Sequence, residues 1–142
     1  MLQEVFYFPI TPRLKALLAT KQFRKLIEHE NDRPRNSRLI TDVYDTQAWR
    51  ELAGTASRPI QRILLQFCID AIPAFAEGSY SLKPAEFMIL SLPPALRAKA
   101  ANIMLFMLIP ATMKSGQKKF YDFAARYELN ALYATGLFIS IY

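Results

Sequence analysis

Residues 59–70 read PIQRILLQFCID, and the order of elements along the whole chain depends on how this stretch folds. Helical spacing is shown by five of its apolar residues: Ile60, Ile63, Leu64, Phe67 and Cys68. A buried strand would also give a continuous apolar run, here over residues 63–69 with Gln66 as the one interruption, and it would end at Asp70. Periodicity leaves both interpretations open, so the neighbouring elements have to decide between them.

The sequence downstream of this stretch has a clearer pattern. It predicts strands over residues 84–91, 103–109 and 137–141, a short helix over 95–101 and a long helix over 117–135. Gly136 follows the long helix as a C-terminal stop. If residues 60–69 are a strand, the order strand, strand, strand, helix, strand is that of the first half of a ribonuclease-H-like fold. The predicted class is therefore α/β, of the α+β type.

This order also predicts how the strands pair. The strands over 60–69, 84–91 and 103–109 are expected to be antiparallel and adjacent in chain order. The strand over 137–141 is expected to lie parallel to the first, because a helical crossover back to the sheet requires a parallel neighbour. A helical structure over 60–69 would remove both this fold and the role of Asp70.

The upstream sequence, residues 1–58, predicts a helical and basic N-terminal region, and residues 59–142 a partial ribonuclease-H-like domain. Three helices are expected: one started by Thr11 and Pro12, one over residues 21–30, and one capped by Asp45 and ended by Gly54. The last of these contains Trp49, which is expected to be an anchor packed on the core.

Length and composition indicate a folded intracellular chain. It has 142 residues, of which 52% are hydrophobic and 21% charged, close to globular averages. Cys68 and His29 are the single cysteine and histidine, which excludes an internal disulfide and Cys- or His-rich metal clusters. No apolar stretch reaches the roughly twenty residues of a membrane span, and the N-terminus lacks a signal pattern. We expect a nuclear or otherwise intracellular protein that is not secreted.

The charge balance favours an anionic partner. Eighteen basic against twelve acidic residues give a net charge of +6, which favours nucleic acid. The candidate DNA-binding residues are Arg33, Arg35 and Arg38 around Pro34, and Lys114, Lys118 and Lys119 at the start of the long helix. A solvated loop and solvated lysines are the alternative interpretations. Binding to duplex DNA is expected to be weak, independent of sequence and sensitive to salt.

The remaining titratable residues give no catalytic arrangement. His29 is expected on an exposed helix face near its C-terminus, and Cys68 is expected to pack as a small core residue. Asp122 and Glu128 lie among polar positions of the long helix, so solvated faces explain them. No serine has a histidine partner in the sequence, and Lys114-Ser115-Gly116 lacks the spacing of a phosphate-binding loop.

Several stretches, in order through nearly the whole chain, resemble one family. They are Phe8-Pro9-Ile10-Thr11-Pro12-Arg13-Leu14-Lys15-Ala16-Leu17, Tyr44-Asp45-Thr46-Gln47-Ala48-Trp49, Ile69-Asp70-Ala71-Ile72-Pro73-Ala74-Phe75, Ser91-Leu92-Pro93-Pro94-Ala95-Leu96-Arg97, Asn102-Ile103-Met104-Leu105 and Leu108-Ile109-Pro110. The chain resembles the Tnp2-like transposases of CACTA-type (En/Spm) DNA transposons. The Leu-Pro-Pro run followed by Arg97 and Asn102 is the most specific part of this resemblance.

The resemblance implies a DDE/D enzyme that cuts and joins DNA ends with Mg²⁺, and it implies that Asp70 is the first catalytic, metal-binding carboxylate. The usual Asp-Gly of the family is Asp70-Ala71 here. The family's upstream zinc-binding region has no counterpart, and its second and third acids would lie beyond Tyr142. The chain therefore resembles a fragment, and a single carboxylate cannot build a two-metal site. We expect no catalysis and no bound Mg²⁺ in this chain alone.

A second hypothesis belongs to a different class of function. The chain is then a non-catalytic DNA-binding or assembly module derived from a transposase. An open sheet edge at residues 137–142 would in either case favour self-association. The nucleotide sequence after codon 142 separates the two hypotheses, because the enzyme needs further acidic codons there.

Overall fold

The computed structural model describes residues 4–33, 39–54, 61–73, 81–110 and 119–135, with side chains from 126 to 134 in the last range. Within these ranges it combines helices with a five-stranded antiparallel sheet, which confirms the predicted mixed α+β class. The predicted strand over 137–141, its parallel pairing and Gly136 lie outside the described residues.

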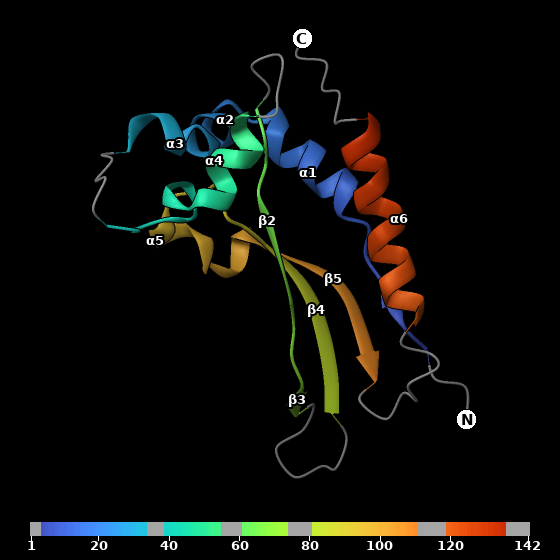
Figure 1. Ribbon diagram of the computed structural model, residues 1–142. Coiled ribbons are helices and arrows are strands. Elements are labelled where there is room, and N and C mark those ends of the chain that lie inside the picture. Colours follow the sequence, from blue (N-terminus) through green and yellow to red (C-terminus); the bar gives the residue numbers. More distant parts are fainter. Residues whose placement is uncertain (1–3, 34–38, 55–60, 74–80, 111–118, 136–142) are drawn as a thin grey trace.

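The sheet has the spatial order β1 (Phe6–Tyr7), β5 (Ile103–Pro110), β4 (Ser81–Ile89) and β2 (Leu65–Ile69), and β3 (Ile72–Pro73) also pairs with β4 (Figure 1). All of these pairs are antiparallel. The stretch that periodicity left open is thus a strand, although it begins at Leu65 rather than at residue 60. The first three predicted strands are adjacent in chain order, as predicted, and β1 is an addition to them.

One edge of the sheet is interrupted at Asp70. The strands β2 and β3 pair with β4 in one continuous register, so they are two parts of a single edge strand. In that register Asp70 lies opposite Pro84, which has no N–H to donate to a ladder. The missing donor explains why strand structure stops at Ile69 and resumes at Ile72.

Eight helical elements lie in the described ranges. They are α1 (Ile10–Ala19), α2 (Lys21–Ile27), α3 (His29–Asp32), α4 (Gln47–Gly54), α5 (Pro94–Arg97), α6 (Lys119–Thr135) and the 3-10 turns η1 (Val43–Asp45) and η2 (Ala100–Asn102). The long predicted helix is confirmed as α6. The short helix predicted over 95–101 is instead two separate turns, α5 and η2.

Two predicted helix boundaries near the N-terminus are wrong. The first helix begins at Ile10, with Pro9 before it, so Thr11 lies inside the first turn and does not cap it. The helix predicted over 21–30 divides at Glu28, whose ψ of 4° leaves helical geometry. The start of α2 is capped by Thr20, whose hydroxyl accepts a hydrogen bond of 3.3 Å from the Phe23 N–H.

The cap predicted for the Trp49 helix is also wrong. The hydroxyl of Thr46, not the carboxylate of Asp45, accepts the N–H of Trp49 at 3.2 Å. Trp49 is buried, as expected, and its ring meets Tyr44 edge-on at 5.0 Å. Its indole N–H donates to Glu30 at 2.7 Å, which satisfies the polar end of the buried ring.

The main core lies between the N-terminal helices and one face of the sheet. Ile10, Leu14 and Leu18 recur every four residues along the buried side of α1. The other members of this core are Phe23, Ile27, Ala85, Phe87, Ile89, Leu92, Met104, Phe106, Met107 and Ile109. Residues from both 1–58 and 59–142 therefore share one hydrophobic core.

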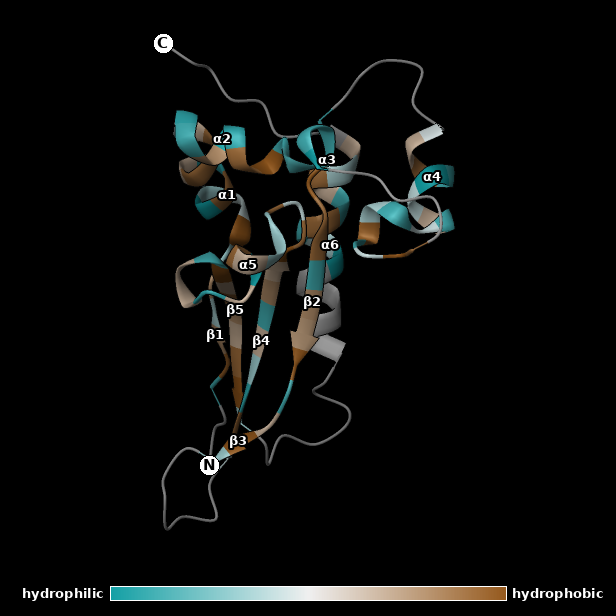
Figure 2. Cartoon of the chain, turned by 90° about the vertical axis from the view of Figure 1, so that its left-hand side faces the viewer, coloured by the Kyte–Doolittle hydropathy of each residue, from teal (hydrophilic) through white to brown (hydrophobic). Residues whose placement is uncertain are grey.

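The far end of the sheet extends beyond helices α1 to α5 (Figure 1). In Figure 2, β2 and β4 carry brown apolar segments separated by teal polar bands. On this end Phe67 and Ile69 are each 41% exposed, and Ile72 is 47% exposed. Phe67 still contacts Phe87 and Phe106 through their rings, so the aromatic cluster continues from the core to the sheet surface.

Candidate functional site

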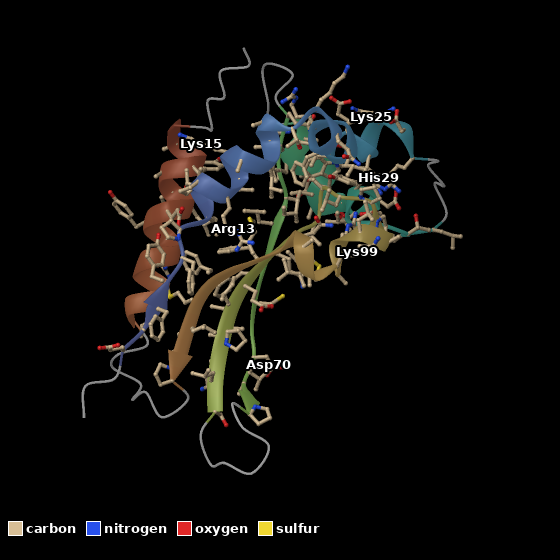
Figure 3. All side chains as sticks on the ribbon, turned by 180° about the vertical axis from the view of Figure 1, so that it is seen from behind. Arg13, Lys15, Lys25, His29, Asp70 and Lys99 are labelled. Atoms are coloured by element: carbon tan, nitrogen blue, oxygen red, sulfur yellow. The ribbon has the colours of Figure 1, made fainter. Side chains whose placement is uncertain are left out.

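Asp70 lies at the solvent-exposed end of β2. Its side chain accepts a hydrogen bond of 2.7 Å from the N–H of Ala71. Figure 3 shows Asp70 near one end of the sheet, away from the labelled basic residues of the helices. Within the described residues no group of three or more His, Cys, Asp or Glu side chains could hold a metal ion. Asp70 is thus an accessible carboxylate that belongs to no such group among the described residues.

Arg33 is not an exposed basic residue. Its guanidinium pairs with both carboxylate oxygens of Asp45, and the Arg33 and Asp45 side chains are only 5% and 8% exposed. It also lies over the ring of Tyr44, 5.9 Å from the centroid. The predicted contact of Arg33 with DNA and the alternative of a solvated loop both need an accessible guanidinium, whereas this guanidinium faces the interior of the fold.

The other predicted DNA-binding residues lie outside the described side chains. This applies to Arg35, Arg38, Lys114, Lys118 and Lys119, of which Lys119 is described as the first backbone position of α6. These five residues stay predictions.

Asp42 joins the N-terminal helices to the turn after β4. Both of its carboxylate oxygens accept hydrogen bonds from one nitrogen of Arg97, at 2.7 and 2.9 Å. The Nε2 atom of His29 lies 3.8 Å from the same carboxylate. His29 is half-buried at the start of α3, so its predicted place on an exposed face near a helix C-terminus is wrong. The His29 ring faces the Asp42 carboxylate instead of solvent.

Glu128 is a buried carboxylate on α6. It is 7% exposed and accepts hydrogen bonds, all of 2.7 Å, from the hydroxyls of Tyr7 and Thr11 and from the Thr11 N–H. The prediction of a solvated helix face is therefore wrong for Glu128. A negative charge here also suits the N-terminus of α1, where the backbone N–H groups lack helical partners.

These contacts shift two pKa values in opposite directions. Burial by itself would raise the pKa of Glu128, but the hydrogen bonds from Thr11 and Tyr7 outweigh it and lower that pKa. Burial, followed by the hydrogen bond to Glu128, raises the pKa of Tyr7 to about 12. At neutral pH Glu128 is therefore a carboxylate and Tyr7 a neutral phenol. Through its hydrogen bonds to Tyr7 and Thr11, Glu128 connects α6 to β1 and α1.

The substitution Glu128→Gln is expected to lower the free energy of unfolding by about 2 kcal/mol at pH 7, because hydrogen bonds to a charged acceptor are lost. Since the folded-state pKa is lowered, the stabilisation is present above the unfolded pKa and disappears as pH falls through the folded value. Urea unfolding from pH 7 to pH 3 should show the two proteins converging below about pH 4.5. The exposed Glu51→Gln variant is the control, and a constant difference across pH would contradict this role of Glu128.

Ser91, Arg97 and Asn102 belong to the stretches that resemble the transposase family. Their side chains form hydrogen bonds to backbone atoms and do not gather into a catalytic group. The Ser91 hydroxyl accepts the Leu64 N–H at 2.8 Å, which extends the contact between the start of β2 and the end of β4. Arg97 Nε donates to the Leu92 carbonyl at 2.7 Å, and the Asn102 side chain donates to the Leu96 carbonyl at 2.8 Å. These contacts hold the turn around α5.

An apolar cavity of about 590 Å³ lies between α1, α6 and the segment before β2. Its lining includes Leu14, Ile63, Leu129, Leu132 and Tyr133. Cys68 lies on the adjacent strand, half-buried and opposite Glu86 of β4. The described lining of this cavity is mainly apolar, and its polar members are Gln61, Arg62, Asn130 and Tyr133.

The chain matches no family model, no curated protein and no solved structure. No helix among the described residues is both long and apolar enough to cross a membrane.

Proposed function

We propose that residues 59–142 are the first half of a ribonuclease-H-like catalytic domain of a cut-and-paste DNA transposase, with Asp70 as its first metal-binding carboxylate. The observation that carries this proposal is the position of Asp70 at the exposed end of the first of three antiparallel strands. A helix, α6, follows the third strand, as the proposed fold requires.

The open side of β2 also supports this proposal. Among the described strands β2 pairs with β4 alone, so its other edge is available for the parallel fourth strand of the proposed fold. The strand β1 is a further addition at the opposite edge, where Phe6 and Tyr7 pair with β5. A segment from the N-terminal region thus covers the edge that the third strand would otherwise expose.

Mg²⁺ in such a domain would stabilise the charge that develops on a transferring phosphoryl group. The described residues do not fit a pair of such ions, because Asp70 is a single carboxylate and belongs to no cluster of ligands. No catalytic step is therefore assigned to this chain alone. DNA is the proposed partner and the nucleus the proposed place of action.

Neither this chain nor its Asp70→Ala variant is expected to cleave supercoiled plasmid with Mg²⁺ or Mn²⁺. The variant should unfold within about 0.5 kcal/mol of the wild type, because the Asp70 side chain is exposed. Plasmid nicking measures the cleavage, and urea unfolding measures the difference in stability between the two proteins. Cleavage that disappears in the variant would show that a site is completed within these residues or by a second copy.

The enzyme hypothesis has a direct test. The nucleotide sequence after codon 142 at the source locus should encode an Asp or Glu within a few residues and another acid further on. A chain extended through both acids should cleave DNA with Mg²⁺ and lose this activity in the isosteric Asp70→Asn variant. Cleavage that survives Asp70→Asn, or the absence of such acidic codons in every frame, would contradict the proposal and favour the non-catalytic module.

Self-association through an open sheet edge is part of the same proposal, and the edge predicted for it, residues 137–142, lies outside the described residues. An unpaired strand edge with apolar residues favours pairing with another chain. Phe67, Ile69 and Ile72 of β2 and β3 are exposed apolar residues that could extend such a contact.

A further inference from the structure

Three basic side chains from separate elements lie around the segment that contains α5 and η2. Arg13 of α1 donates to the carbonyl of Ile103, at the start of β5, at 3.5 Å. Lys99 immediately precedes η2, which ends next to Ile103. Lys25 of α2 lines a pocket together with Pro93, which immediately precedes α5. Figure 3 shows these three residues together with His29 on the helical part of the molecule.

These cations are available to a ligand. Arg13, Lys25 and Lys99 are exposed, and among the described residues none of them has a carboxylate within ion-pair distance. Arg33 and Arg97 are instead paired with Asp45 and Asp42 inside the fold. Arg13, Lys25 and Lys99 thus carry exposed positive charge on three separate parts of the chain.

The pocket beside Lys25 has hydrogen-bond donors within a mostly apolar lining. Its volume is about 250 Å³, and its lining consists of Gln22, Lys25, Leu26, His29, Asp32 and Pro93. The side chains of Gln22, Lys25 and His29 supply hydrogen-bond donors, and Asp32 is the one acid in the lining. Glu28 is a second exposed acid on the same helical segment.

We propose that Arg13, Lys25 and Lys99, together with the pocket beside Lys25, bind the phosphate backbone of duplex DNA. The choice of DNA as partner rests on the proposed function. Cations on several elements suit the repeated phosphates of a duplex, and such contacts carry no sequence information. The pocket lining and the two other cations include no Phe, Tyr or Trp, whereas single-strand binding uses stacked aromatic side chains.

The test compares two variants that each lose two lysines. Lys25→Gln/Lys99→Gln removes charge from the proposed surface, and Lys15→Gln/Lys83→Gln removes the same charge from α1 and β4. Fluorescence anisotropy with a duplex of about 30 base pairs, from about 50 to 200 mM KCl, gives affinities and salt slopes. The first variant should bind about tenfold more weakly and lower the slope of log K against log salt by about two. The control should change affinity less than about twofold, and equal thermal unfolding midpoints confirm that both variants fold.

Each other outcome overturns a defined part of the inference. Equal losses in both variants would show that overall charge alone attracts DNA, which refutes this surface and leaves the transposase proposal standing. No binding of the wild type at 50 mM KCl would refute DNA as the partner as well. Displacement of the duplex by polyglutamate at matched charge would show that the surface binds any polyanion.

Discussion

Asp45→Ala is expected to lower the free energy of unfolding by about 3 to 5 kcal/mol, the range for removing one partner of a buried ion pair. Arg33 would remain buried without a counter-charge, since both side chains are almost inaccessible to solvent. The same carboxylate also accepts the backbone N–H groups of Thr41 at 2.9 Å and Asp42 at 3.0 Å, so two further donors would lose their acceptor. Urea denaturation at pH 7 measures the loss.

Two further variants make this result decisive. Asp32→Ala removes an exposed acid from α3 and should change stability by less than about 0.5 kcal/mol. Arg33→Met/Asp45→Ala keeps the net charge and should recover a large part of the lost stability, because no unpaired charge remains. Its affinity for duplex DNA should equal that of the wild type. A fivefold weaker affinity would return Arg33 to the DNA-binding surface, and a loss below about 1 kcal/mol for Asp45→Ala would refute the structural role of the pair.

Asp42→Ala is expected to cost about 3 kcal/mol or more, for a related reason. The Asp42 side chain is 3% exposed and that of Arg97 is 14% exposed, so the variant leaves a mostly buried guanidinium with the Leu92 carbonyl as its remaining acceptor. His29 would lose its neighbouring carboxylate in the same step. The contact between Asp42 and Arg97 joins the start of η1 to the turn at α5. Its loss should therefore weaken the packing of the N-terminal region against the sheet.

A double-mutant cycle with Arg97→Met separates the pair from the packing around it. The double variant should be more stable than Asp42→Ala, because the methionine needs no counter-charge. The coupling free energy obtained from urea denaturation should be at least about 1 kcal/mol. Additive losses would show that Asp42 and Arg97 act independently and would contradict an ion pair between them.

Much of the sheet could be predicted from local sequence because its strands are apolar runs bounded by prolines and polar turns. Ile103–Pro110 is predicted almost to the residue, and the strand over Ser81–Ile89 is predicted from Pro84 onward. The stretch before Asp70 could not be decided in this way, because its apolar residues satisfy both periodicities. Pairing with β4, where Leu65 faces Ile89 and Ile69 faces Ala85, selects the strand.

The polar contacts could not be predicted from local pattern. Glu128 occupies a polar position of an amphipathic helix, and its partners Tyr7 and Thr11 lie more than a hundred residues earlier in the chain. Arg33 lies in the densest basic stretch, yet Asp45 turns it into a buried structural residue. The strand β1 has two residues and no periodicity of its own, so only its pairing with β5 reveals it.

The sequence by itself determined the net charge of +6, the long helix α6 and the apolar strands around the core. The helix and the strands depend on spacing within one segment, where side chains three or four residues apart share a helix face and apolar runs favour burial. Only the tertiary structure decided that residues 65–69 are a strand, which carboxylates and cations are buried together, and which cations remain exposed. Those outcomes depend on the free energy of contacts between segments distant in sequence, and no local spacing specifies such contacts.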